Sequence, residues 1–338
     1  MYTNPALPST GHNMANKNIV LCSDGIENRD IKARGTNVFK LYEAVDIQGH
    51  KDDKKKTPQV AFYDDGIGTS SLLPLRILGG AFGWGFSKNV RDLYTELVHV
   101  YQPGDRLYLF GFSHGAYTIR ALAGMIQYCG IVDINGVSNG VLENRVNACW
   151  KEFTAVAFKR KWDVDRRGNV VPTETPASGL TRRKSLGAII HSEFVPDGQP
   201  SIEFVGVWDT VAAVGLPFEE LRDILNFIYP VKFAELFPGS RIKRACHALS
   251  IDDERQSFHP ELWNEQRASR PDQIKQVWFT GVHSNVGGGY PKQGMSLVAL
   301  DWMMAEAEQC GLRFIPGDRE SIRTHQDIHD KLYDPPPD

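Results

Sequence analysis

The sequence predicts an α/β fold in which helices cover both faces of a doubly wound, mainly parallel sheet. Short apolar runs typical of buried strands alternate with longer segments of helical spacing. This alternation produces right-handed strand–helix–strand units, in which neighbouring strands are parallel. The chain of 338 residues, 41% hydrophobic and 23% charged, is long and apolar enough to bury a large core. We therefore expect a single domain over residues 18–333, between a flexible leader at 1–17 and a tail at 334–338.

Five apolar runs are predicted to be strands of this sheet. Each is short, rich in branched or aromatic residues, and followed by a turn or polar residue. In chain order they are Asn18–Cys22, Gln59–Tyr63, Arg106–Phe110, Ser201–Trp208 and Gln276–Val282.

Four segments are predicted to be helices, of which Ser87–Tyr101 is amphipathic and Ala116–Tyr128 is apolar and rich in small residues. They are Thr36–Val45, Ser87–Tyr101, Ala116–Tyr128 and Ser296–Cys310. A hydroxyl or amide oxygen before a helix can accept from its first backbone N–H groups. We therefore expect Thr36 or Asn37 to cap the first helix and Ser87 to cap the second.

Two stretches interrupt the alternation and are predicted to be insertions, at about 130–200 and 211–272. Insertions of this length commonly carry substrate walls or lids. A third stretch, Gly66–Phe86, is apolar but broken by glycines. It is interpreted either as a lid or channel wall that meets an apolar ligand, or as a packed connection between a strand and a helix.

Composition excludes several classes of function. The net charge is −3 and the pI about 6.4, so no basic excess indicates a nucleic-acid partner. The five cysteines are scattered without a CxxC pair, which argues against a zinc site or a disulfide framework. The N-terminus is polar and has no apolar signal-peptide core. We expect a cytoplasmic protein, or one exported without a signal peptide.

A candidate nucleophile follows the third predicted strand. Gly111-Phe112-Ser113-His114-Gly115 fits the pattern G-x-S-x-G and precedes a predicted helix. A nucleophilic serine must stand exposed on a tight strand-to-helix turn, and the flanking glycines permit that turn. The context favours Ser113 as a nucleophile over an incidental serine in a glycine-rich turn.

A serine hydroxyl needs a base, and the base needs a group that orients it. Where this turn is used, the acid and the histidine follow the serine in that order at later strand ends. Asp209 closes the fourth strand and His283 the fifth. Alternative acids are Asp252, Asp253 and Glu203, and alternative histidines are His191, His247 and His259. Asp209 could instead cap a helix, and His283 could be a core histidine.

The oxyanion needs backbone N–H donors. The backbone N–H of His114 is the first candidate, because it follows the nucleophile. The second donor comes from a loop after an early strand, for which Asp24-Gly25 and Asp65-Gly66 are candidates. We prefer Gly25, with Asp24 bracing the turn.

Together these motifs resemble a known family. The matching pieces are Ser23-Asp24-Gly25 with Asn28, Asn37-Val38, Tyr63–Thr69, GFSHGA (111–116), VGVWDTV (205–211) and WFTGVHSNVGGGY (278–290). They resemble the DUF2235 family, the catalytic domain of Tle1-type phospholipase effectors of bacterial type VI secretion. The resemblance spans about residues 18–310. The WDTV and GVHSxVGGGY pieces are its most specific parts.

The resemblance implies an α/β-hydrolase fold and ester hydrolysis, with phospholipids as the best-known substrates. It assigns the nucleophile to Ser113, the acid to Asp209 and the base to His283. The sequence departs from the family's DGTWN at Ile26 and Glu27. It also has His114 where the family usually has Arg, and Asn285 where it usually has Asp.

We therefore expect a serine hydrolase that cleaves a lipid or other ester through an acyl-serine, without a metal or organic cofactor. Contact with a membrane surface and a secretion-apparatus or immunity partner are further expectations from the resemblance. The alternatives are a small-molecule or carbohydrate esterase without a membrane role, and a non-catalytic binding module on the same fold.

Overall fold

The computed structural model describes residues 16–25, 35–66, 81–159, 162–164, 170–172, 189–191, 201–211, 241–255 and 259–333. Residues 1–15 of the predicted leader, the tail, most of the Gly66–Phe86 stretch and large parts of both predicted insertions lie outside the described residues. Lys17, at the end of the predicted leader, is buried and pairs with Asp105.

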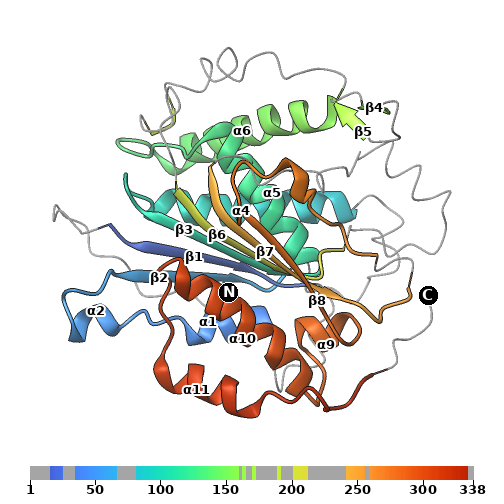
Figure 1. Ribbon diagram of the computed structural model, residues 1–338. Helices are drawn as coiled ribbons and strands as arrows, with labels where there is room; N and C mark the ends of the chain where they lie inside the picture. Colours follow the sequence, from blue (N-terminus) through green and yellow to red (C-terminus); the bar gives the residue numbers. More distant parts are fainter. Residues whose placement is uncertain are drawn as a thin grey trace.

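Within the described residues, six strands form one sheet in the order β2-β1-β3-β6-β7-β8 (Figure 1). All neighbouring pairs are parallel. The strands are β1 (Asn18–Ser23), β2 (Gln59–Asp64), β3 (Arg106–Phe112), β6 (Ser201–Trp208), β7 (Ile242–Ser250) and β8 (Ile274–Phe279). The described chain adds one short antiparallel hairpin, β4 (Trp162–Val164) with β5 (Val170–Pro172).

Helices cover both faces of the sheet, which confirms the predicted fold class. One face carries α4 (Ala81–Val100), α5 (His114–Cys129) and α6 (Asn139–Lys159) (Figure 1). The other carries α1 (Asn37–Ala44), α10 (Gly294–Gln309) and α11 (Pro316–His325), with the short α9 (His283–Gly287) close by. The short helices α2 (Gly49–Asp52) and η4 (Glu265–Arg267) complete the described elements.

The core is divided by the sheet into two apolar layers. Successive side chains of β1 and β3 point to opposite faces, and both faces are covered, so nearly every position is buried. Ile19 and Leu21 pack with the α4–α5–α6 layer. Val20 and Cys22 pack with the α1–α10 layer. The continuous apolar runs in the sequence are the direct consequence.

Two helix starts show how well local signals predict the ends of elements. Thr36 caps α1, and its Oγ accepts from the backbone N–H of Phe39 (3.2 Å). Ser87 does not cap α4, because the helix begins at Ala81 and Ser87 lies within it, where its carbonyl accepts from Arg91. The helix therefore starts six residues before the predicted cap.

The predicted insertion at 211–272 contains an element of the main sheet. Residues 242–250 form β7, which pairs with β6 on one side and β8 on the other. The run IKRACHALS has two basic residues and a histidine, so it lacks the apolar signal of the other inner strands. Most of its side chains are buried because both faces of the sheet are covered there: Ala245 packs in one apolar layer, and Cys246 and Ala248 pack in the other.

Along the described part of the chain, none of the helices combines the length and apolar character that a membrane span requires. The carboxyl ends of β1, β3, β6 and β7 meet at one edge of the parallel sheet, and the polar residues that follow them gather there.

Candidate active site

Ser113 occupies a sharp turn between β3 and α5. Its backbone has φ 57° and ψ −123°, a region that residues other than glycine rarely adopt. The backbone N–H of Ser113 donates to the carbonyl of Trp208 (3.1 Å), and its carbonyl accepts from Tyr117 (3.2 Å). These bonds hold the strained conformation from both sides. The serine is 7% exposed at the sheet edge.

The two glycines that flank this turn are required by close backbone approach. A Cβ on Gly115 would lie 2.1 Å from the carbonyl oxygen of Ser23. A Cβ on Gly111 would lie 2.5 Å from the carbonyl oxygen of Gly115. Both distances are far below van der Waals contact, so the glycines of G-x-S-x-G let α5 descend directly onto β1 and β3.

Asp209 follows β6 in the strand next to β3. Its backbone also has a positive φ, of 40°, and its N–H donates to the carbonyl of Ala248 (2.8 Å). The carboxylate is fully buried. Ser250 donates to it twice, from its backbone N–H to Oδ1 (3.0 Å) and from its hydroxyl to Oδ2 (2.8 Å).

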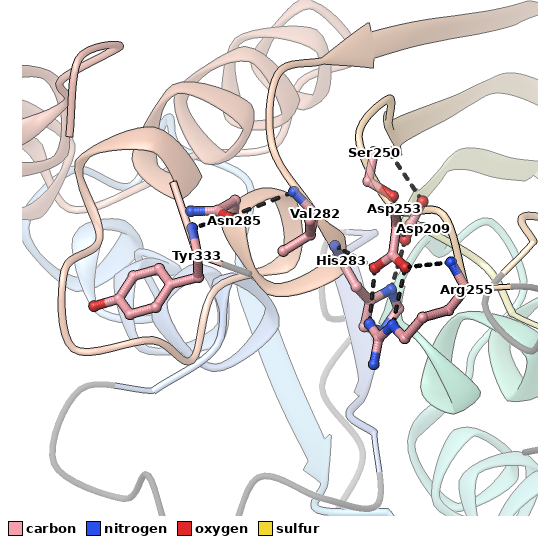
Figure 2. A network of polar contacts seen from close by, with 8 residues as sticks. All are labelled: Asp209, Ser250, Asp253, Arg255, Val282, His283, Asn285 and Tyr333. Carbon is pink, nitrogen blue, oxygen red and sulfur yellow. Dashed lines mark hydrogen bonds and ion pairs between the residues drawn. The ribbon is translucent and has the colours of Figure 1, made fainter. Parts of the chain in front are cut away.

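His283 completes an acid–histidine pair. Its Nδ1 lies 2.5 Å from Oδ2 of Asp209, and both side chains are buried (Figure 2). The sequence predicts that His283 directly follows the last strand, but the structure places it further on. The strand ends at Phe279, and a turn through Gly281, at φ 110°, leads to His283 as the first residue of α9.

Phe112 links the serine turn to the histidine. Its ring lies 4.6 Å from the His283 ring, centroid to centroid, at an angle of 31°. A Cβ on Gly287 would lie 1.9 Å from the Phe112 ring, so only glycine lets α9 pack this closely. The three predicted residues Ser113, Asp209 and His283 are thus brought to one place by contacts between β3, β6 and α9.

The alternative acids have other partners. Glu203 forms an ion pair with Lys243 (2.6 Å). Asp252 and Asp253 accept from the backbone N–H groups of Gly281 (2.6 Å) and His283 (3.0 Å). Both therefore lie at the loop that carries the histidine, where their carboxylates bind backbone N–H groups.

The alternative histidines are placed elsewhere. His247 is fully buried, accepts from the backbone N–H of Thr210 (3.1 Å) and lies against Trp263. Burial and then the nearby Arg120 hold the pKa of His247 well below its usual value. His191 is buried with its ring 5.3 Å from that of Tyr101, and His259 is exposed.

Gly25 lies directly opposite the serine. A Cβ at this position would be 3.2 Å from Cβ of Ser113 and 3.6 Å from its Oγ. The backbone N–H of Gly25 donates to Oδ1 of Asp24 (2.8 Å). The donor predicted to bind the oxyanion is therefore already held by the neighbouring carboxylate, and it can serve the oxyanion only by sharing or releasing that bond.

Asp24 holds the Gly25 turn in place through its side chain. Its side chain is buried, and Oδ2 accepts from the hydroxyls of Thr36 and Tyr63, the latter at 2.7 Å. Burial and then the charge of Asp24 raise the pKa of Tyr63, so this hydroxyl remains a donor. Asp24 thus ties β1 to β2 and to the start of α1.

His114 is the first residue of α5. Its backbone N–H belongs to the first helical turn, where N–H groups point toward the helix N-terminus. Its imidazole is partly buried, and desolvation, followed by the proximity of His283, lowers the pKa of His114 to about 4. The ring is therefore neutral at physiological pH.

Two polar residues of the site escape sequence reasoning. Ser250 holds the Asp209 carboxylate, and Arg255 pairs with Asp253 through two bonds of 2.9 and 2.7 Å (Figure 2). Ser250 ends β7 and Arg255 follows it. The sequence does not reveal β7 as a strand, so nothing local places these residues at the sheet edge. Among the described residues, no group of three or more His, Cys, Asp or Glu is placed to hold a metal ion.

An inner strand of a parallel sheet that turns through a strained serine into a covering helix defines an α/β-hydrolase. Residues 17–306 match the family described as "T6SS, Phospholipase effector Tle1-like, catalytic domain". The chain belongs to this family, as its motifs predict.

The chain is similar to a yeast protein and to solved structures. The uncharacterized protein YEL023C of Saccharomyces cerevisiae is 27% identical over 266 residues, which are 74% of this chain and 33% of that protein. A crystal structure of an uncharacterized protein from Pseudomonas aeruginosa is 21% identical with a TM-score of 0.45, covering 92% of this chain and 48% of that one. The Tle1 effector bound to the VgrG spike is 18% identical with a TM-score of 0.35, covering 81% and 51%. The chain therefore spans a third of the yeast relative and about half of each bacterial one.

Proposed function

We propose that this chain hydrolyses carboxylic esters through an acyl-enzyme formed on Ser113. The observation that carries the proposal is the strained turn at Ser113, held beside a buried carboxylate–histidine pair whose Oδ2–Nδ1 distance is 2.5 Å. A serine in a sparsely populated backbone conformation, next to such a pair, is the arrangement that acyl transfer requires. Membership of a phospholipase effector family supports the same reaction class.

Asp209 sets the tautomer of the base. Because its Oδ2 accepts at Nδ1, the imidazole proton resides on Nδ1, and Nε2 is left as the proton acceptor. Nε2 of His283 takes the Ser113 proton as Oγ attacks the acyl carbon. It then gives this proton to the leaving alkoxide as the ester C–O bond breaks.

Deacylation reverses these roles. A water molecule attacks the acyl-serine while Nε2 takes one of its protons. The Ser113–acyl bond breaks, and the proton passes to Oγ, which restores the enzyme and releases the acid. Asp209 stabilises the imidazolium in both halves because its charge is buried and held by Ser250.

The oxyanion would be held chiefly by the backbone N–H of His114, at the start of α5. Gly25 contributes space, because any side chain there would crowd Ser113. The neutral imidazole of His114 adds no charge to this pocket at physiological pH.

A phospholipid or other lipid ester is the substrate class that family membership favours. The Tle1 effector in the comparison is bound to a VgrG spike. A secretion-apparatus or immunity partner, membrane contact and export without a signal peptide stay predictions for this chain.

A substrate panel tests the proposal. Purified protein is incubated with phosphatidylcholine vesicles, triacylglycerol emulsion, acetylated sugar and p-nitrophenyl butyrate, and released acid is measured. We expect hydrolysis of at least one ester, loss of that activity in Ser113→Ala, and full activity in Ser321→Ala, which changes an exposed serine of α11. Retention of wild-type turnover in Ser113→Ala would overturn the proposed mechanism.

A further inference from the structure

We propose that the segment Ser250–Arg255, from the last residue of β7 into the loop that follows, positions both the acid and the base of the site. We further propose that Arg255 cancels the charge of a second carboxylate beside the base. This inference rests on the proposed function and adds positioning residues to it. Ser250 acts on Asp209, Asp253 acts on the backbone of His283, and Arg255 acts on Asp253 (Figure 2). Asp252 acts on Gly281 in the same loop.

Ser250 positions the acid of the site, Asp209. Its two donors engage one oxygen each of the Asp209 carboxylate, at 3.0 and 2.8 Å. A carboxylate held at both oxygens cannot rotate without losing a hydrogen bond in a buried site. Ser250 therefore fixes the oxygen that faces Nδ1 of His283.

Asp252 and Asp253 position the loop that carries the base, His283. Asp252 exchanges two hydrogen bonds with Gly281, donating from its N–H to the carbonyl (3.2 Å) and accepting at Oδ2 (2.6 Å). Asp253 accepts at Oδ2 from the backbone N–H of His283 (3.0 Å). The turn between β8 and α9 is thereby anchored at both ends to the residues after β7.

This anchoring places a second negative charge close to the base. The Asp253 side chain is only 1% exposed, and an unpaired carboxylate there would favour the protonated form of the nearby imidazole. Arg255 pairs with it in a bidentate manner and is itself 13% exposed. Burial alone would raise the pKa of Asp253, but the bonds from Arg255 and from His283 hold it below its usual value.

The charged and titratable groups around His283 come from several elements. Asp209 faces the ring from the end of β6, and His114, on α5, is close enough to interact electrostatically with it. Asp252 and the Asp253–Arg255 pair adjoin it from the segment after β7, and Tyr290 lies near the same pair. Because His114 is neutral above about pH 4, it adds no charge beside the base at neutral pH.

Charge variants test the charge-cancelling role of Arg255 with opposite signs. We measure kcat/KM for p-nitrophenyl butyrate from pH 5 to 9 in Arg255→Gln, Asp253→Asn and the double variant. In Arg255→Gln the charge of Asp253 is no longer compensated, so the acidic limb of the kcat/KM profile should move up by about 0.5–1 pH unit. In Asp253→Asn the charge of Arg255 is no longer compensated, so the same limb should move down by a similar amount. The double variant should return to the wild-type limb. Arg255→Lys and the exposed control Glu254→Gln should also keep it.

Two shifts of opposite sign distinguish a charge effect from structural loosening. If Arg255→Gln fails to fold, the downward shift in Asp253→Asn tests the charge effect by itself, because Asn still accepts from the His283 N–H.

The role of Ser250 is tested by Ser250→Ala, which should lower kcat about tenfold with KM within twofold. Ser250→Thr, which keeps the hydroxyl, should restore kcat.

The outcomes separate this inference from the proposed function. An active wild type whose acid limb is unchanged in every charge variant overturns the charge-cancelling role of Arg255 and leaves ester hydrolysis standing. Unchanged kcat in Ser250→Ala does the same for the positioning role of Ser250. A wild type that neither hydrolyses esters nor reacts with a fluorophosphonate overturns the proposed function and this inference with it.

Discussion

The backbone N–H of Ser113 donates to the carbonyl of Trp208, the residue directly before Asp209, across a distance of 3.1 Å. This bond joins the two turns that leave the adjacent strands β3 and β6. Both turn residues have positive φ, 57° for Ser113 and 40° for Asp209. Among the described residues, Asp272 alone shares this property with them outside the glycines. Backbone strain in the described chain is thus concentrated where the serine and the acid meet.

The close packing at Gly115 makes a prediction about stability. Gly115→Ala should destabilise the fold by more than about 3 kcal/mol, because the new Cβ would lie 2.1 Å from the Ser23 carbonyl oxygen. Urea unfolding followed by circular dichroism measures the change. The control is Gly140→Ala on α6, where a Cβ meets nothing within 4 Å and should stabilise the helix by about 0.5–1 kcal/mol. Equal stability of the Gly115 and Gly140 variants would show that the turn is looser than described.

Removing the charge of the acid should disable the base without unfolding the protein. In Asp209→Asn we expect kcat to fall about 10⁴-fold, because the amide cannot stabilise the imidazolium and favours the wrong tautomer. Ester hydrolysis is measured beside the far-ultraviolet circular dichroism spectrum. Asp318→Asn, on the exposed start of α11, is the matched control. A drop below tenfold would remove Asp209 from the triad and return attention to Asp253.

The glycine opposite the nucleophile should control access to it. Gly25→Ala places a methyl 3.2 Å from Cβ and 3.6 Å from Oγ of Ser113, so kcat/KM should fall about 10- to 100-fold through displacement of the reacting groups. Gly317→Ala, whose Cβ meets nothing within 4 Å, should leave kcat/KM unchanged. Undiminished activity in Gly25→Ala would mean that the acyl group does not pass this position.

The lowered pKa of His114 predicts a pH dependence of stability. The unfolded chain binds a proton at this ring near pH 6.5 and the folded chain only near pH 4. Because the unfolded state binds more protons between these values, this group makes the free energy of unfolding increase as pH rises from 4 to 6.5. Allowing for partial solvent access, His114→Gln should remove about 1–2 kcal/mol of that increase. Urea titrations at pH 4.5 and 7 measure it, and parallel curves for the two proteins would contradict the assignment.

The sequence predicts those parts of the fold that local signals specify. The runs at β1, β2, β3 and β6 are apolar because both faces of the sheet are covered, and Thr36 is a cap whose side chain can act locally. The strand β7 is different, because its Lys, Arg and His residues are accommodated by partners distant in sequence. Arg244, for example, pairs with Glu306 on α10.

The same limit applies to the site. Ser113, Asp209 and His283 follow recognisable strands, so their order along the chain predicts that they meet. Ser250 ends the unrecognised β7 and Arg255 follows it, and their roles depend on contacts across the sheet edge. Asp253 is visible in the sequence as a possible acid, but only the structure shows that it contacts the backbone N–H of His283.

The most direct test of the central claim is covalent labelling of the nucleophile. The purified chain is treated with a fluorophosphonate, digested and analysed by mass spectrometry. We predict one phosphonylated peptide, containing Ser113, in the wild type. Labelling should be absent in Ser113→Ala and much slower in Asp209→Asn. An unlabelled Ser113 in a protein that still hydrolyses esters, or equal labelling of Ser113→Ala, would contradict the account.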